Sequence, residues 1–223
     1  MPLVNAAELV KAAHKSHYCI GAFNTNNLEW TRAILAGAQE LNVPVIIQTS
    51  MGAAKYMGGY EFCQTMIEAT VKAMGITVPV VIHLDHGNYE AAKEAIAAGY
   101  KAGIGNIHGQ YPDNWKGLHF DRLQELNDAV KMPLVLHGGS GIPQEQVQKA
   151  ITMGISKLNI NTECQLAFAK ATREYIEAGK DQQGKGFDPR KMLKPGTDAI
   201  TDTFKEITGW IGNKPVKMVP EAL

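Results

Sequence analysis

The chain has 223 residues, which is enough for one substantial hydrophobic core and short for two enzyme-sized domains. Its 22 basic and 22 acidic residues balance, so no basic field favours binding to nucleic acid or to an anionic membrane. No apolar segment approaches the length of a membrane span, and the first three residues do not open a signal peptide. These features predict a soluble, cytoplasmic protein.

The cysteines Cys19, Cys63 and Cys164 are odd in number, lie in apolar settings and lack metal-binding spacing. We expect buried thiols in a reducing compartment, in agreement with a cytoplasmic location.

Helical and strand-like segments alternate through the first half of the chain. A helix is expected from Asn5 to about His14, because Asn5 and Glu8 have the spacing of a capping box. Short β-branched runs predict buried strands, each followed by a helix. In chain order these are strand 18–23, helix 28–41, strand 45–47, helix 60–74, strand 80–82 and helix 89–98.

The second half repeats this alternation, although Gly103 and Gly105 weaken its first strand. The expected segments are strand 100–106, helix 121–130, strand 134–137, helix 143–153, strand 155–161, helix 162–178, an exposed Gly-rich loop 179–195 and helix 198–210. Alternation without hairpin signals predicts parallel strands joined by helical crossovers in a single domain spanning 1–223.

Six strands can be counted, whereas a (β/α)8 barrel has eight. An open doubly wound sheet would accept six. However, no Gly-x-Gly-x-x-Gly turn follows any strand, so the usual nucleotide site of that fold is missing from the sequence.

Three histidines that are each followed by glycine lie at the ends of three strand-like runs: His86, His108 and His137. A catalytic zinc typically has three protein ligands and one open position. In a barrel, the carboxyl ends of the strands meet at one mouth. The sequence therefore predicts a zinc site. His83, deeper in its strand, is expected to be a hydrogen-bonded core residue.

Asp85 is adjacent to His86, and strand alternation would send the two side chains to opposite faces. Both can reach one site only if the strand ends or bulges there, which Gly87 permits. Asp85 is either a partner that orients an imidazole or an acid/base group, and the residues alone leave both roles open.

Two stretches have the composition of anion-binding loops. Gly138, Gly139, Ser140 and Gly141 lie between a strand and a helix, so backbone N–H groups and the helix dipole can converge on an anion. The run from Asn159 to Thr162 offers the same kind of anion site in the next βα unit. Two such successive loops form a phosphate site in many barrel enzymes. Asn24 and Ser50, at the ends of the first two strands, are candidates to hold the far side of the ligand.

Taken together, these motifs resemble those of class II, zinc-dependent fructose-bisphosphate aldolases. The resemblance covers nearly the whole chain and rests on Ala22-Phe23-Asn24, Gln48-Thr49-Ser50, His83-Leu84-Asp85-His86-Gly87, Gly105-Asn106-Ile107-His108-Gly109, Leu136-His137-Gly138-Gly139-Ser140-Gly141 and Asn159-Ile160-Asn161-Thr162. It implies a (β/α)8 TIM barrel, a homodimer or homotetramer, and reversible cleavage of a sugar bisphosphate to dihydroxyacetone phosphate and an aldehyde phosphate.

The resemblance also assigns roles to residues. His86, His108 and His137 would hold Zn²⁺, a monovalent cation is a further candidate, and Asp85 would handle the proton of the hydroxyl at the bond that breaks. Substrate would be held by Asn24, Ser50, Gly109, Gly138, Ser140, Asn159, Asn161 and Thr162. Arg190 resembles an arginine that reaches the other phosphate from a neighbouring subunit. Cleavage leaves an enediolate, whose charge a Lewis-acid zinc can stabilise.

The chain departs from the family at the junction of Tyr100 and Lys101, where about two βα units are missing. These units would carry the glutamate that acts as the general base. Two alternatives stay open: a tagatose-bisphosphate aldolase, and a zinc-binding barrel with impaired catalysis.

Overall fold

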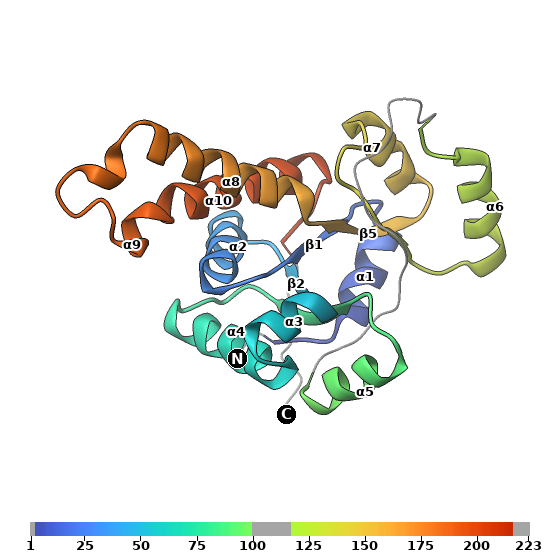
Figure 1. Cartoon of the computed structure of the whole chain (residues 1–223). Helices are drawn as coiled ribbons and strands as arrows, with labels where there is room; N and C mark the ends of the chain where they lie inside the picture. Colours follow the sequence, from blue (N-terminus) through green and yellow to red (C-terminus); the bar gives the residue numbers. More distant parts are fainter. Residues whose placement is uncertain (1–2, 100–116, 216–223) are drawn as a thin grey trace.

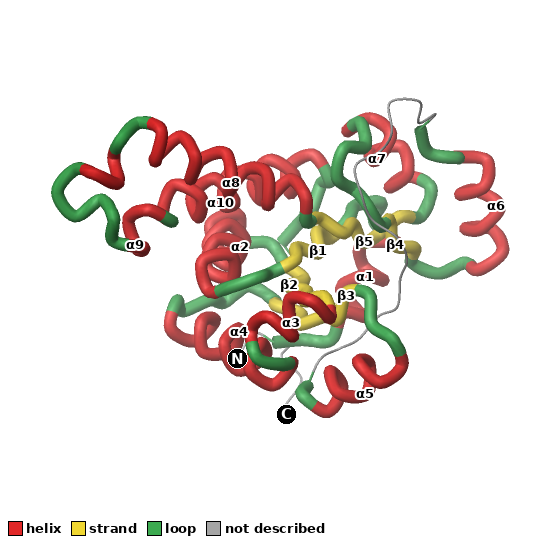
Figure 2. Tube along the Cα trace, in the orientation of Figure 1, coloured by secondary structure: helices red, strands yellow, loops and turns green. Residues whose placement is uncertain are grey.

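The computed structural model describes residues 3–99 and 117–215 (Figure 1). Within these residues, five strands lie at the centre and helices surround them (Figure 2). The strands are β1 (Ile20–Asn24), β2 (Val45–Ser50), β3 (Val80–Asp85), β4 (Leu134–Leu136) and β5 (Ile155–Ile160). The predicted strand 100–106 lies outside the described residues.

All strand pairs are parallel, and the order across the sheet is β3-β2-β1-β5-β4. The first strand therefore lies between the second strand and the last one, as in a barrel in which the two ends of the chain meet. Ala22 of β1 is in register with Ile46 on one side and Asn159 on the other. Because the strands are parallel, their carboxyl ends share one edge.

Helices connect and cover the strands. Their bounds are α1 (Ala6–Lys15), α2 (Leu28–Leu41), α3 (Met51–Met57), α4 (Tyr60–Ala73), α5 (Tyr89–Ala97), α6 (Phe120–Val130), α7 (Gln144–Thr152), α8 (Thr162–Glu177), the 3-10 turn η1 (Lys180–Gln182), α9 (Pro189–Met192) and α10 (Lys194–Trp210). Asparagine side chains cap three of them: Asn5 accepts from Ala7 N, Asn27 from Trp30 N, and Asn88 from Ala91 N.

The inner face of the strands changes from apolar to polar along their length. At the amino ends, Ile20, Ala22, Ile46 and Val81 pack together with Leu9 of α1. Side chains two residues apart share a face, so Asn24, Gln48, His83 and Asp85 continue this face toward the carboxyl ends. These four polar residues are all buried. The polar end of this inner face is the candidate site.

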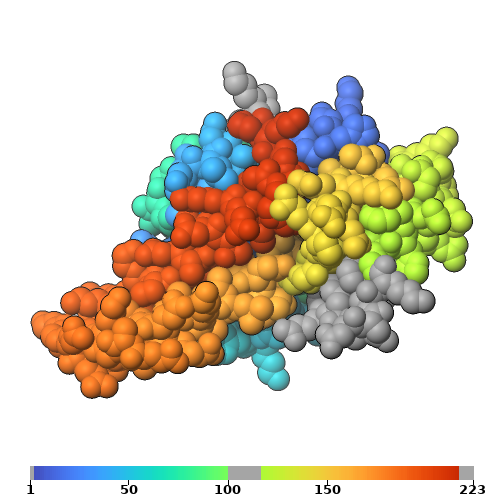
Figure 3. Space-filling view, turned by 90° about the horizontal axis from the view of Figure 1, so that it is seen from above, coloured from blue at the N-terminus to red at the C-terminus, as the bar shows by residue number. Residues whose placement is uncertain are grey.

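Helices α8 and α10 form an arm that projects from the body, with η1 and α9 at its end (Figure 3). The sequence predicted an exposed loop over 179–195, and this prediction is wrong, because that stretch holds η1, α9 and the start of α10. The cause is local: Asp188 accepts a hydrogen bond from Arg190 N at 2.9 Å, and Pro189 occupies the first helical position.

The short helix α3 was also missed by the sequence analysis. It begins directly after β2, where Ser50 Oγ accepts a hydrogen bond from Ala53 N at 3.1 Å. One serine therefore ends the strand and caps the helix, which left no separate loop to recognise.

The arm is anchored to the body through Phe204 of α10. This ring is fully buried, and its centroid lies 4.5 Å from that of Phe23 in β1. A Cβ atom added at Gly37 of α2 would lie 2.5 Å from the Phe204 ring, so only glycine admits the ring there. The same contact joins α10, α2 and the central strand.

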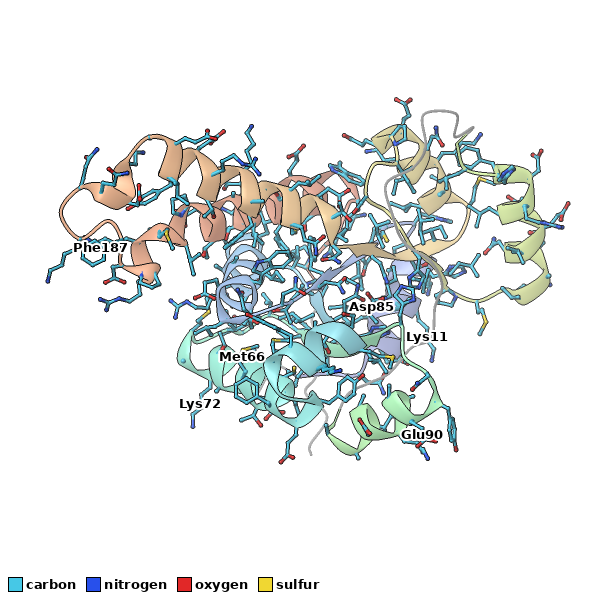
Figure 4. The ribbon with its side chains drawn as sticks, in the orientation of Figure 1. Lys11, Met66, Lys72, Asp85, Glu90 and Phe187 are labelled. Carbon is cyan, nitrogen blue, oxygen red and sulfur yellow. The ribbon has the colours of Figure 1, made fainter. Side chains whose placement is uncertain are left out.

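We expect Phe204→Ala to lower the free energy of unfolding by about 3–5 kcal/mol, because it leaves a cavity between α10 and β1. Denaturant unfolding followed by circular dichroism measures the change. Phe187→Ala is the matched control, because Phe187 is 68% exposed and lies at the end of the arm (Figure 4). Equal losses in the two variants would contradict this account of the anchor.

Candidate metal and substrate site

Asp85 and His86 reach one site because β3 ends between them. Asp85 is the last residue of the strand, and His86 adopts a left-handed backbone conformation with φ 54°. That conformation is unfavourable for a non-glycine residue and is kept where the surroundings impose it. Gly87 fits for a steric reason, because a Cβ atom there would lie 2.3 Å from Leu84 Cδ2.

Two of the three predicted zinc ligands come together. The imidazole centroids of His86 and His137 lie 4.8 Å apart, and one ligand atom each from Asp85, His86 and His137 lie within 4.8 Å of one another. Two imidazoles and a carboxylate are donors that zinc accepts, so these residues fit the metal. His108 and Gly109 lie outside the described residues.

The Asp85 carboxylate is buried and held by two side-chain amides. Asn24 Nδ2 donates to Asp85 Oδ2 at 2.9 Å, and Asn159 Nδ2 donates to Asp85 Oδ1 at 3.0 Å. His86 Nε2 lies 3.5 Å from Asp85 Oδ1. The carboxylate is therefore fixed beside a candidate metal ligand, as its sequence position suggested.

Both amides lead back to Lys157. Its Nζ donates to Asn159 Oδ1 at 2.6 Å and to Gln48 Oε1 at 3.3 Å. Gln48 Nε2 in turn donates to Asn24 Oδ1 at 2.7 Å. Five buried side chains from four strands thus form a closed ring of hydrogen bonds, which we call the polar ring: Asn24, Gln48, Asp85, Lys157 and Asn159.

Burial lowers the pKa of Lys157 from its usual 10.5 to about 8, while the negative charge of Asp85 and the thiol of Cys19 act in the opposite direction. An ammonium in this position has lost its water, and two amide oxygens replace part of that hydration.

The predicted anion-binding loop packs closely against β5. Gly138 has φ 64°, and a Cβ atom added at Gly139 would lie 3.0 Å from the Asn159 carbonyl oxygen. These two glycines therefore allow the loop to approach the strand that carries Asn159. The close approach brings the loop backbone next to the polar ring.

A glutamate that the sequence analysis did not single out contacts this loop. Ser140 Oγ donates to Glu163 Oε2, and Gly141 N donates to Glu163 Oε1 at 3.2 Å. A carboxylate therefore interacts with the hydroxyl and the backbone N–H group that were predicted to bind phosphate. The donors are suited to an anion, and a ligand phosphate would have to displace Glu163 from them.

The remaining predicted residues lie at the same edge of the strands, with one exception. Asn161 and Thr162 begin α8, and Ser50 caps α3 beside Asp85 in the strand register. Arg190 is far along the arm, with an 88% exposed side chain that pairs with Asp188. The fold of this chain does not bring Arg190 to the polar ring. The Arg190 guanidinium lowers the pKa of Asp188 to about 2.

Lys157 and Gln48 are functional candidates that sequence reasoning missed. Lys157 precedes Asn159 by two residues in a strand, so the two side chains had to share a face. That spacing was the available signal.

Parallel strands with a candidate metal site and a glycine-rich anion loop at their carboxyl ends define a TIM-barrel-like protein of the kind that binds phosphorylated ligands. A family model described as class-II fructose-bisphosphate aldolase matches residues 4–102 and 101–215. The chain therefore belongs to the class-II fructose-bisphosphate aldolase family.

Curated relatives agree with this assignment. The chain is 43% identical to fructose-bisphosphate aldolases of Streptococcus pyogenes serotype M3 and Streptococcus pneumoniae serotype 4, and 41% identical to that of Mycoplasma pneumoniae. Each comparison covers 92% of this chain and 96% of the relative. The alignment with the first relative spans 282 positions, which exceeds the 223 residues of this chain.

Solved structures show the same fold. The YdjI aldolase of Escherichia coli K12 superposes with a TM-score of 0.79 at 23% identity, covering 95% of this chain and 98% of that one. A fructose-bisphosphate aldolase of Campylobacter jejuni superposes with a TM-score of 0.76 at 20% identity, covering 94% of this chain and 95% of that one.

Within residues 3–99 and 117–215, no helix is long and apolar enough to cross a membrane.

His83 is buried as predicted, but its Nδ1 lacks a hydrogen-bond partner among the described residues. Desolvation, followed by the charges of Lys157 and His137, lowers the pKa of His83 to about 3. Between about pH 6.5 and pH 3, the unfolded chain therefore binds a proton at this residue and the folded protein does not.

The free energy of unfolding should therefore fall as the pH drops below 6.5. We expect metal-free wild type to lose about 1.4 kcal/mol per pH unit more than His83→Phe between pH 6 and 5. Urea unfolding at each pH measures the difference. Parallel pH curves for the two proteins would be inconsistent with a neutral, buried His83.

Proposed function

We propose that this chain is a zinc-dependent lyase that reversibly cleaves fructose 1,6-bisphosphate to dihydroxyacetone phosphate and glyceraldehyde 3-phosphate. The observation that carries the proposal is the convergence of Asp85, His86 and His137 beside the Gly138–Gly141 loop. Membership of the aldolase family and the names of the curated relatives supply the substrate.

In this proposal, His86 and His137 hold the zinc together with His108, which lies outside the described residues. Zinc, when bound, supplies a Lewis acid that stabilises negative charge developing on a substrate oxygen. A monovalent cation is proposed as an additional ion. No lysine Schiff base is then required for the cleavage.

Asp85 is the proposed acid/base group. Its carboxylate takes the proton of the substrate hydroxyl as that oxygen becomes the carbonyl of the leaving aldehyde. The electron pair of the broken carbon–carbon bond stays with the dihydroxyacetone phosphate fragment. The amides of Asn24 and Asn159 hold the carboxylate for this transfer. The dihydroxyacetone phosphate fragment then takes up a proton at carbon. The glutamate that delivers it, and that removes it as general base in the reverse direction, is assigned to the missing family segment.

The glycine-rich loop is proposed to bind the phosphate of dihydroxyacetone phosphate through Gly138 and Ser140, helped by Asn161, Thr162 and Gly109. Glu163 now contacts Ser140 and Gly141, so phosphate binding requires that this carboxylate move away.

The other end of the substrate is assigned to residues at the opposite side of the mouth. Ser50 and Asn24 contribute polar groups there, whereas Asn159 lies on the side of the glycine-rich loop. Arg190 is exposed on the arm. In a homodimer or homotetramer, it is proposed to reach the second phosphate of the substrate that is bound in the partner subunit. A cytoplasmic location suits this chemistry and the three reduced, buried cysteines.

Two alternatives share the same observations. A tagatose-bisphosphate aldolase would use the same residues on a substrate of different stereochemistry. A zinc-binding barrel with impaired catalysis would keep the imidazoles and lack turnover.

We expect zinc-loaded protein to cleave fructose 1,6-bisphosphate faster than tagatose 1,6-bisphosphate in a coupled assay. His86→Ala and His137→Ala should each lose zinc on dialysis and reduce activity at least roughly 100-fold, because a ligand is lost. His17→Ala, which alters an exposed histidine, is the control. Faster cleavage of tagatose bisphosphate would favour the first alternative, and zinc binding without turnover the second.

We further propose that the natural protein contains a segment of about two βα units between Tyr100 and Lys101. Two findings support this: the family matches the chain in two pieces that meet at residues 101–102, and the alignment is longer than the chain. In the described sheet, β3 and β4 are the outer strands, and the junction lies between them in sequence. A barrel with strands missing would leave unpaired backbone groups at those edges.

The mass of the protein isolated from its natural source tests this proposal. We expect an intact mass well above the 24.3 kDa of the present sequence, with the additional peptides mapping between Tyr100 and Lys101. A mass of 24.3 kDa with a peptide spanning Tyr100–Lys101 would contradict it.

A further inference from the structure

Lys157 occupies a place that the proposed mechanism does not use. It is 5% exposed, lies on the inner face of β5, and contributes the positive charge of the polar ring. Burying an ammonium is costly, and hydrogen bonds together with a nearby opposite charge are needed to offset the lost hydration. Its two contacts are both to amide oxygens, and each amide continues toward the candidate metal site.

An ammonium group can only donate hydrogen bonds, so it fixes which end of each amide faces it. Asn159 must turn Oδ1 toward Lys157 and Nδ2 away from it. Gln48 must do the same, which leaves Gln48 Nε2 to donate to Asn24 Oδ1 and Asn24 Nδ2 to donate to Asp85. Every amide in the ring therefore points its NH2 group from Lys157 toward Asp85.

Two branches of the polar ring lead from Lys157 to different imidazoles, and each branch is here called an arm of the polar ring. The arm through Gln48 and Asn24 holds Asp85, whose Oδ1 lies 3.5 Å from His86 Nε2. The arm through Asn159 ends on His137, whose Nδ1 lies 3.0 Å from Asn159 Nδ2.

The hydrogen bond from Asn159 also determines which nitrogen of the His137 imidazole carries the proton. Because the Asn159 NH2 group is a donor, His137 Nδ1 accepts and carries a lone pair, and the neutral ring has its proton on Nε2. In this tautomer only Nδ1 has a lone pair for a metal, so Lys157 favours the form of His137 that can bind through Nδ1, and zinc would take the place of the Asn159 N–H at that atom.

We propose that Lys157 is a positioning residue: its ammonium orients the amides of Gln48, Asn24 and Asn159, and through them the Asp85 carboxylate, His86 and the tautomer of His137. Among the described residues, the hydrogen bonds of Lys157 go to amide oxygens and not to the imidazoles. Lys157 acts on them through one amide on one side and through two amides and a carboxylate on the other. The inference rests on the proposed zinc site, and it adds to that site a residue that positions the metal ligands.

The first test observes the tautomer without metal or substrate. In metal-free protein labelled with 15N-histidine, wild type should show His137 as the Nε2–H form, with the signal assigned through His137→Gln. Lys157→Met should give a mixture of both tautomers, because Asn159 becomes free to turn. An unchanged His137 signal in Lys157→Met would overturn the proposal.

The second test measures zinc affinity by competition with a chromogenic chelator. Lys157→Met should weaken zinc binding by at least roughly tenfold, as is typical when a residue that orients metal ligands is lost. Lys170→Met makes the same change at a 75% exposed lysine of α8 and should leave affinity and tautomer as in wild type. Equal zinc affinity in the Lys157 and Lys170 variants would overturn the proposal.

Gln48→Leu separates a positioning role from a general loosening of the core, and it keeps the inference testable if Lys157→Met does not fold. It cuts only the arm toward Asp85, so it should weaken zinc binding and leave the His137 tautomer unchanged. In the Lys157→Met background, Gln48→Leu should cost almost nothing further, because that arm is already released. A tautomer shift in Gln48→Leu, or full additivity, would overturn the proposal.

These outcomes separate the inference from the proposed function. If wild type binds zinc and lacks aldolase activity, the proposed function fails and the tautomer measurements still decide the role of Lys157. If wild type is active and Lys157→Met retains the wild-type tautomer and zinc affinity, the inference fails alone.

Discussion

The ammonium of Lys157 and the carboxylate of Asp85 are connected inside the strands by the side-chain amides of Gln48, Asn24 and Asn159. Two opposite charges are thus buried without touching, and each amide has both its donor and its acceptor end engaged. A network of this kind tolerates little rearrangement, because any turned amide would leave buried polar groups unpaired. The candidate site depends on it, since Asp85, His86 and His137 are all held from this ring.

The strand order explains how such distant residues meet. β1 lies between β2 and β5, so Asn24 has Gln48 on one neighbouring strand, and Asn159 lies on the other. The arm formed by α8 and α10 is tied to the same central strand through Phe204 and Phe23. Packing outside the strands and hydrogen bonding inside them therefore fix the position of β1 from two sides. The site takes its rigidity from the strands, whereas its anion loop takes its shape from Gly138 and Gly139.

Glu163 places a carboxylate of the chain itself on the anion-binding loop. Its carboxylate contacts Ser140 and Gly141, where the sequence predicts a phosphate. Two donors of the loop, the Ser140 hydroxyl and the Gly141 N–H group, are thus already paired with a carboxylate of the chain itself. A phosphorylated ligand that binds there would exchange one anion for another. Because Glu163 already keeps the two donors aligned in the free protein, less ordering is needed when the ligand binds.

Local patterns in the sequence determined the alternation of strands and helices, the cap at Asn5 and the strand ends that carry Asn24, Asp85 and His137, because these depend on neighbouring residues. They also predicted that Asp85 and His86 could share a site only if the strand stopped at that point, and the left-handed conformation of His86 meets this condition. Only the tertiary structure decided that Lys157 belongs to the site, that Glu163 contacts the anion loop, and that residues 179–195 form part of a helical arm. The physical reason is that a buried polar side chain is defined by its partners, and here those partners lie on other strands, up to 109 residues away for Lys157 and Gln48.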